Sequence, residues 1–243
     1  MITQLYFWKP LVEKHKKELS VVEHYYNKTK VQLENMDEEI NSYCQNLYDK
    51  SCIKYHRNDI EPSSLAEWIH EQGIEMAETL LLINSNHLLM TISMLYHIWE
   101  QQIIKFTLKE LEHYFEIDKK VLKYDSVHKI FELHGLDICR TKSWTKIKEL
   151  KKLVNTIKHG DGESADSLRK IRPDFFKNDY STYDTLKLHG SVLIDIDTLN
   201  VKESDLFEYV NATKDFWDEM PERAYSNTDS IIKVLEKNND QKK

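Results

Sequence analysis

The sequence predicts a mainly α-helical protein, and two observations carry that prediction. Only 5 glycines and 4 prolines occur in 243 residues, so few turns or breaks divide the chain. Apolar residues recur at spacings of three and four over long stretches, which is the period of an amphipathic helix rather than of a strand. With 40% apolar and 31% charged residues, the composition is that of a globular protein. Because no internal repeat is present, we expect a single helical domain over residues 1–243.

The N-terminal part, residues 1–62, is expected to hold a long helix and a connection. Residues 3–48 predict one long helix, or two helices joined end to end. The interruption at residues 27–30 favours a helix that packs on the rest of the chain, while a coiled-coil arm against a partner stays open. The apolar stripe that carries the prediction is Leu5, Trp8, Val12, Leu19, Val22, Tyr26, Leu33, Met36, Ile40, Tyr43 and Leu47.

The helical core is expected over residues 63–179, and its first helix runs to about Phe115. Pro62 precedes this helix, and Ser63 or Ser64 can cap it. The segment 84–86 (Asn-Ser-Asn) is the expected place for a break or kink. The strongest apolar stripe in the chain follows, which puts this helix at the centre of the fold: Leu88, Ile92, Leu95, Trp99, Ile103 and Phe106.

Three shorter helices complete the predicted core. One covers residues 121–134 and is closed by Gly135. The next runs from Trp144 to Lys158, capped by Ser143 and stopped by Gly160. A third begins at Ser164 and is ended by Pro173, because the residue before a proline disfavours helix.

The last part, residues 180–236, is expected to combine a small β-hairpin with a final helix. Two apolar runs, 186–188 and 192–194, flank His189-Gly190-Ser191, a pattern that predicts a hairpin within residues 183–196. Asn200 followed by Glu203 resembles a capping box for a helix that reaches Trp217. The tail, residues 237–243, is polar and expected to be disordered.

Several classes of protein are excluded by composition. The most apolar run, residues 80–99, contains polar residues and is too interrupted for a membrane helix. The N-terminus lacks a basic start and an apolar core, and three cysteines in no CxxC spacing suggest reduced thiols, so we expect a cytoplasmic protein.

No phosphate-binding loop or dinucleotide motif is present, so no cofactor is expected. Two Glu-x-x-His pairs, at residues 67–70 and 110–113, match the spacing of di-iron bundles no better than chance, and no metal site is predicted.

One stretch of the chain is strongly basic although the whole carries a net charge of −7. Between Arg140 and Lys158 there are seven cations and one anion, Glu149. On a helical wheel, Lys148, Lys152, Asn155 and His159 fall on the side opposite the apolar residues. One explanation of this cluster is a solvent-exposed helix face that binds no ligand. The sharper hypothesis is a phosphodiester site, with lysines neutralising phosphate and a histidine moving a proton.

The string Lys151-Lys152-Leu153-Val154-Asn155-Thr156-Ile157-Lys158-His159-Gly160, late in an all-helical domain, resembles the active-site helix of HEPN-like (higher eukaryotes and prokaryotes nucleotide-binding) proteins. In this resemblance His159 matches the motif histidine and Asn155 the polar position before it. The motif arginine has no match, since Val154 precedes Asn155 and the nearest cation at a permitted spacing is Lys152.

The resemblance implies a function and further site residues. HEPN-like proteins include ribonuclease toxins of toxin–antitoxin systems and phage-defence proteins, and many form homodimers. The resemblance implies a homodimer that binds RNA or acts as a metal-independent endoribonuclease, with His159, Asn155, Lys152 and Glu100 as catalytic candidates. Lys148 and Lys158 would bind RNA. Arg169 or Arg172 could supply the missing cation, or equally could pair with Asp166 or Asp174. The alternative is a non-catalytic interaction module that regulates a protein partner, with the long N-terminal helix as its working surface.

Overall fold

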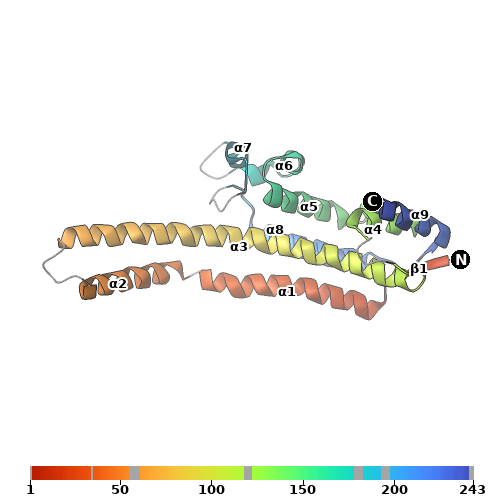
Figure 1. Ribbon diagram of the computed structural model, residues 1–243, viewed down its shortest axis with the longest axis horizontal. Helices are drawn as coiled ribbons and strands as arrows, with labels where there is room; N and C mark the ends of the chain where they lie inside the picture. Colours follow the sequence, from red (N-terminus) through yellow and green to blue (C-terminus); the bar gives the residue numbers. More distant parts are fainter. Residues whose placement is uncertain are drawn as a thin grey trace.

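The computed structural model describes residues 2–33, 35–54, 61–117, 122–177, 183–192 and 198–240, and within them the predicted mainly helical class is confirmed (Figure 1). In chain order the elements are β1 (Ile2–Tyr6), α1 (Lys9–Leu33), α2 (Met36–Lys54), α3 (Pro62–Glu112), α4 (Tyr124–Leu133), η1 (Ile138–Arg140), α5 (Trp144–His159), α6 (Glu163–Arg169), η2 (Pro173–Phe176), α7 (Thr185–His189), α8 (Glu203–Asp218), β2 (Arg223–Asn227) and α9 (Thr228–Asp240).

The N-terminal segment begins as a strand rather than as the start of a helix. β1 pairs with β2 in antiparallel register, with Leu5 opposite Ala224 and Thr3 opposite Ser226. Leu5 and Thr3 are fully buried, so β1 contributes to the core on one face. The prediction of helix over residues 3–8 is therefore wrong, because the strand partner lies far along the chain. The alternative of two helices joined end to end is confirmed by α1 and α2.

α3 is one continuous helix of 51 residues, about 77 Å long at the usual rise per residue. The expected break at residues 84–86 is absent, and Glu61 rather than Ser63 or Ser64 occupies the cap position. α2 packs antiparallel against the first half of α3, and together they project beyond the rest of the molecule (Figure 1). We call α2 and residues 62–88 of α3 the arm, and the remainder the body.

The core of the body forms where α8 lies against both α1 and α3. Trp99 of α3 meets Phe216 of α8 edge to face at 5.2 Å, and Phe106 meets Trp217 at 5.7 Å. Both tryptophans are buried, and the stripe from Ile92 to Phe106 lies in the core, as the sequence predicts. α4 and α5 also pack on α3, α5 lies against α8 as well, and α9 covers α4.

The segment predicted as a hairpin is helical where the structure describes it. α7 spans Thr185–His189, so the expected strand at 186–188 is wrong; residues 193–197 lie outside the described residues. The Asp184 side chain accepts a hydrogen bond from the Lys187 N–H, and Gly190 ends the helix in the left-handed conformation. These two caps outweigh the alternating apolar pattern.

The C-terminal part also corrects two expectations. The final predicted helix is α8, but Lys202 rather than Asn200 takes the cap position, and the carboxylate of Asp205 accepts from its N–H. The expected disordered tail is helical through Asp240 in α9, while residues 241–243 lie outside the described part. Across all the segments that the structure describes, no helix combines the length and apolarity needed to cross a membrane.

A basic face and pocket on α5

The predicted site helix forms as expected, from Trp144 to His159. Its apolar residues Ile147, Leu150 and Leu153 are buried against α3 and α8. Gly160 ends the helix with φ of 73°, a conformation that favours glycine. Ser143 stands at the cap position, but its hydroxyl donates to Glu219 at 2.7 Å instead of capping the helix.

Opposite the buried face, a track of polar and aromatic side chains runs along the whole length of α5. Trp144, Lys148, Lys151, Asn155 and Lys158 follow one another at helical spacing, and His159 lies beside Lys158 at the end. Lys148, Lys158 and His159 are exposed, and Asn155 is half-buried. The side chains of these four make no hydrogen bond or ion pair with any other described residue, so they are available to a ligand. We call these six residues the α5 track.

Lys152, one of the predicted catalytic residues, is turned away from this track. Its ammonium donates to the carbonyl of Ser167 in α6 at 3.4 Å. α6 packs along this side of α5 and covers it. Lys152 therefore fastens one helix to another, and its neighbour Lys151 takes its place on the open side.

A pocket of about 450 Å³ opens beside the first half of the track. Its walls include Trp144, Lys148 and Lys151 of α5 and Tyr124 and His128 of α4. The ammonium of Lys151 lies over the Tyr124 ring, 4.2 Å from its centroid, and the His128 ring meets Trp144 edge to face at 5.7 Å. Aromatic walls with cations at the rim suit a nucleobase with its phosphate.

His128 also has a thiol within reach. Its Nε2 lies 3.2 Å from Sγ of Cys139, which is exposed and not in a disulfide. The pocket therefore carries an imidazole of its own, independent of His159.

Glu100, the predicted acidic partner of His159, lies near the pocket instead. Its carboxylate accepts a hydrogen bond from the Tyr96 hydroxyl at 3.0 Å and lies 3.8 Å from Nδ1 of His97. Burial raises the pKa of Tyr124, and the negative charge of Glu100 raises it further. Because the Lys151 ammonium lies over the Tyr124 ring, and Glu100 acts on the same tyrosine, Glu100 lies near Lys151. His159 lies eight residues further along α5, about 12 Å away along the helix axis.

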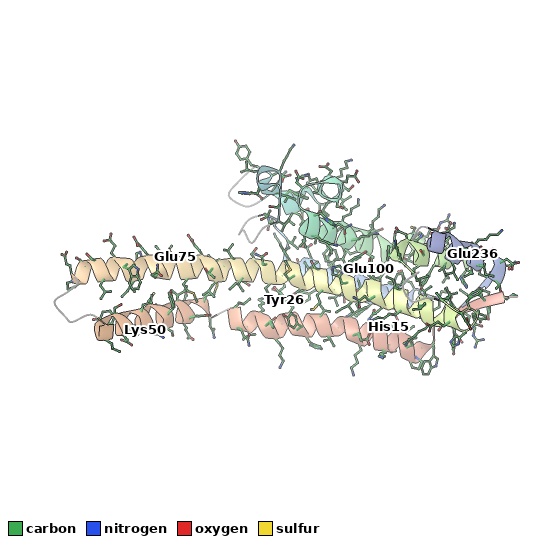
Figure 2. All side chains as sticks on the ribbon, in the orientation of Figure 1. His15, Tyr26, Lys50, Glu75, Glu100 and Glu236 are labelled. Carbon is green, nitrogen blue, oxygen red and sulfur yellow. The ribbon has the colours of Figure 1, made fainter. Side chains whose placement is uncertain are left out.

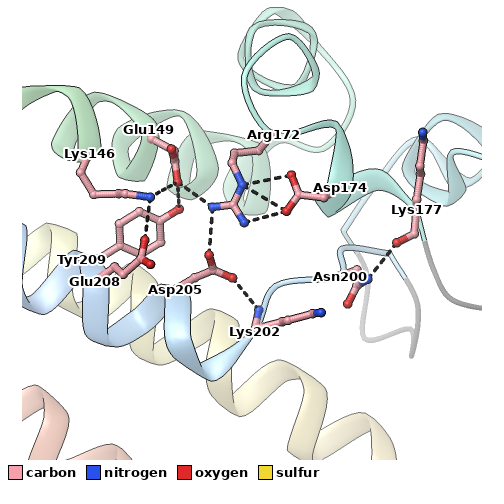
Figure 3. A network of polar contacts seen from close by, with 10 residues as sticks. All are labelled: Lys146, Glu149, Arg172, Asp174, Lys177, Asn200, Lys202, Asp205, Glu208 and Tyr209. Carbon is pink, nitrogen blue, oxygen red and sulfur yellow. Dashed lines mark hydrogen bonds and ion pairs between the residues drawn. The ribbon is translucent and has the colours of Figure 1, made fainter.

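Arg172, predicted as a cation for RNA, is held inside a network between α5 and α8 (Figure 3). Its guanidinium pairs with Glu149 at 2.8 Å, Asp205 at 2.9 Å and Asp174 at 2.7 Å, and it stacks on the Phe175 ring. Burial lowers the pKa of Arg172, but its hydrogen bonds to the three carboxylates outweigh this effect and raise the pKa above its ordinary value. The arginine is a structural cation.

Arg169 is engaged in the same way one turn earlier. It pairs with Asp161 at 2.7 Å, with Asp166 at 2.9 Å and with Asp184, which precedes α7. The hydrogen bond to Asp184 is the largest contribution that raises its pKa. With three carboxylates around it, Arg169 ties α6 to α7 and adds no free positive charge for RNA.

Some of the predicted site residues thus lie together in the structure, and further residues that were not predicted lie beside them. Lys148, Asn155, Lys158 and His159 share one open face. Lys152, Glu100, Arg169 and Arg172 are occupied elsewhere. Lys151, Trp144, Tyr124 and His128 were missed as site residues. The i, i+4 pair Tyr124 and His128 on the polar side of α4 was the available signal, but nothing in the sequence shows that α4 lies beside α5.

No group of three His, Cys, Asp or Glu side chains that could hold a metal occurs among the described residues. Comparison of the chain with protein-family models, with curated proteins and with solved structures finds no match.

Proposed function

We propose that this protein binds single-stranded RNA along the α5 track. The observation that carries the proposal is that lysines without a carboxylate partner among the described residues lie beside an aromatic pocket on one helix face. Lys148, Lys151 and Lys158 would neutralise successive phosphates, and a base would stack against Trp144 in the pocket. Asn155 and His159 would contribute hydrogen bonds to sugar or phosphate oxygens.

The charge distribution over the molecule supports this orientation of the ligand. The sequence from Pro62 to Ile104 contains no lysine or arginine, and four of its glutamates lie in the arm. An RNA strand is repelled by the acidic arm and attracted to α5, so the net charge of −7 does not oppose local binding. A basic face on an acidic protein restricts where RNA can bind rather than preventing it.

Binding is better supported than cleavage. His159 is exposed, Glu100 and Lys152 are occupied at other positions, and both arginines are paired with carboxylates. A phosphodiester transferase needs a base, an acid and a cation around one phosphate. On the α5 track His159 has Lys158 and Asn155 as neighbours, and none of the six track residues is acidic.

The proposal is tested by fluorescence anisotropy with a labelled 12-nucleotide single-stranded RNA of mixed sequence. The double variant Lys148→Glu/Lys151→Glu is expected to weaken binding at least tenfold. The slope of log affinity against log salt should fall by about 1.4, because each lost phosphate contact on a single strand accounts for roughly 0.7. Trp144→Ala should weaken binding without changing that slope.

The matched control is Lys17→Glu/Lys28→Glu on α1. Both lysines are exposed, the change in net charge is the same, and α1 lies across α3 from α5 (Figure 1). Equal loss of affinity in the two double variants would mean that only overall charge matters, and unchanged affinity in the α5 variant would reject the proposal.

A further inference from the structure

One row of apolar residues on α3 is buried in the body and open in the arm. Ile74, Leu81, Leu88 and Leu95 are seven residues apart and so lie along one side of the helix. Leu95 is 0% exposed, Leu88 is half-buried, and Leu81 and Ile74 are 44% and 48% exposed. The same side of α3 is thus buried in the body and exposed to solvent in the arm, and the change occurs at Leu88.

In the body this side of α3 lies against both α1 and α8, and the Gln102 amide donates to the His15 carbonyl of α1 at 3.1 Å. The next residue of the row, Gln102, accepts a hydrogen bond from the indole N–H of Trp217 in α8 at 3.2 Å. α8 begins at Glu203, which pairs with Lys30 near the end of α1 at 2.7 Å. The third helix of the α1–α3–α8 packing therefore starts where the arm begins, and the α2–α3 pair continues without an equivalent.

The arm shows the consequence of the missing third helix. α2 packs against α3 through half-buried residues such as Ile40 and Cys44, and no described side chain of α2 is fully buried. Figure 2 shows α2 beside the first part of α3, with Lys50 labelled on α2 and Glu75 on α3. We call the row formed by Ile74, Leu81 and Leu88 the seam. α2 and α3 alone leave one side of the seam exposed to solvent, whereas a third helix laid over the seam would bury it.

The flank of this seam is acidic. Glu67, Glu71 and Glu78 lie next to the seam on the helical wheel, and no lysine or arginine occurs on α3 before Lys105. A helix that covers the seam must therefore bring positive charge to its edge. In the described part of this chain the basic helix α5 is already packed in the body, so a second copy offers no free helix of that kind.

We propose that the arm is a docking site for a basic amphipathic helix of another polypeptide. The partner helix would place an apolar stripe on Ile74, Leu81 and Leu88, with lysines or arginines facing Glu67, Glu71 and Glu78. It would extend the line of α8 along the arm and complete a three-helix bundle.

The test uses the full chain and two labelled 21-residue designed helical peptides with leucine at heptad positions a and d. One peptide carries lysine at e and g, and the other carries glutamate there. The wild-type protein is expected to bind the lysine peptide at least twentyfold more tightly than the glutamate peptide. Ile74→Asp/Leu81→Asp should weaken binding of the lysine peptide at least tenfold. The matched control, Ile171→Asp/Ile232→Asp, changes two exposed isoleucines of the body and should leave binding unchanged.

Reversing the arm charges gives a result that misfolding cannot produce. The variant Glu67→Lys/Glu71→Lys/Glu78→Lys is expected to prefer the glutamate peptide. Retained preference for the lysine peptide would overturn the proposal, as would equal weakening in the control variant. Light scattering on the wild type provides a second check. A dimer that Ile74→Asp/Leu81→Asp dissociates would show that a second copy covers the arm, which would also overturn the proposal.

Discussion

The guanidinium of Arg172 lies 2.8 Å from the carboxylate of Glu149, and both side chains are largely buried between α5 and α8. Glu149 also accepts hydrogen bonds from the Tyr209 hydroxyl at 2.8 Å and from Lys146 at 3.1 Å (Figure 3). The one acidic residue in the basic stretch of the sequence is thus the point at which α5 is fixed to α8. Lys146 is held in this network, whereas Lys148 and Lys158 of the same helix stay exposed.

Arg172→Met should destabilise the protein by about 3–5 kcal/mol, because Glu149 and Asp205 would stay buried without their shared cation. The exposed pair Arg140–Asp137 provides the control, and Arg140→Met should cost less than about 1 kcal/mol. Urea unfolding followed by circular dichroism measures both. Adding Glu149→Gln to Arg172→Met should recover part of the loss. A double variant less stable than the single one would contradict this account.

His134 should make stability depend on pH. Burial lowers its pKa below the ordinary 6.5, and Nδ1 of the neutral ring donates to the Ile130 carbonyl at 2.7 Å. Below pH 6.5 the unfolded chain takes up a proton at this site before the folded chain does. The free energy of unfolding should therefore be greatest above pH 6.5 and fall as pH decreases toward the folded-state pKa, by at most about 1.4 kcal/mol per pH unit.

The measurement compares urea unfolding at several pH values for wild type, His134→Asn and the control His70→Asn. The His134 variant should lose part of the pH dependence, and the rest should remain because burial also lowers the pKa values of His15 and His87. Identical pH profiles for wild type and His134→Asn would exclude His134 as a contributor.

Gly160→Ala should destabilise the protein more than Gly135→Ala. Both glycines have positive φ, of 73° and 78°, so either alanine costs about 1–2 kcal/mol in backbone strain. Only at Gly160 would the added Cβ meet another segment, 2.5 Å from the Gly190 carbonyl oxygen. Thermal or urea unfolding of the two variants isolates this contact, and equal losses would show that the Gly160–Gly190 approach relaxes without penalty.

Incubation of total cellular RNA and tRNA with purified protein in EDTA should give no cleavage, because the α5 track brings no acidic group or arginine to His159. RNA binding should persist in the same buffer. Cutting that survives EDTA and disappears in a well-folded His159→Ala variant would instead establish a metal-independent ribonuclease.

Much of α5 could be predicted from the sequence, because its periodicity fixes the buried face and Gly160 fixes its end. The wheel alone could not separate Lys151 from Lys152, since only the packing of α6 shows which side of α5 is covered. The sequence left Arg169 and Arg172 either free to bind RNA or paired with Asp166 and Asp174, and both of these pairs form. Their more distant carboxylate partners Asp184 and Asp205 lie 15 and 33 residues away and meet them only in the folded chain.

The errors in secondary structure have related causes. β1 follows a helical apolar spacing and becomes a strand only because β2 pairs with it. At residues 186–188 the alternating pattern predicted a strand, but the caps Asp184 and Gly190 were readable in the sequence and specify one short helix. The uninterrupted course of α3 through residues 84–86 reflects its packing along α1 and α2, which outweighs the low helix propensity of Asn and Ser.

The pairing of β1 with β2 bears on the order of events during translation. Thr3 and the residue that accepts its hydrogen bond, Ser226, are 223 positions apart, so the first strand leaves the ribosome long before its partner exists. Until then β1 presents an unpaired edge and the side chains of Leu5 and Phe7 have no completed core to enter. The nascent chain therefore finishes its fold late, and protection of this segment by a chaperone would matter most during that interval.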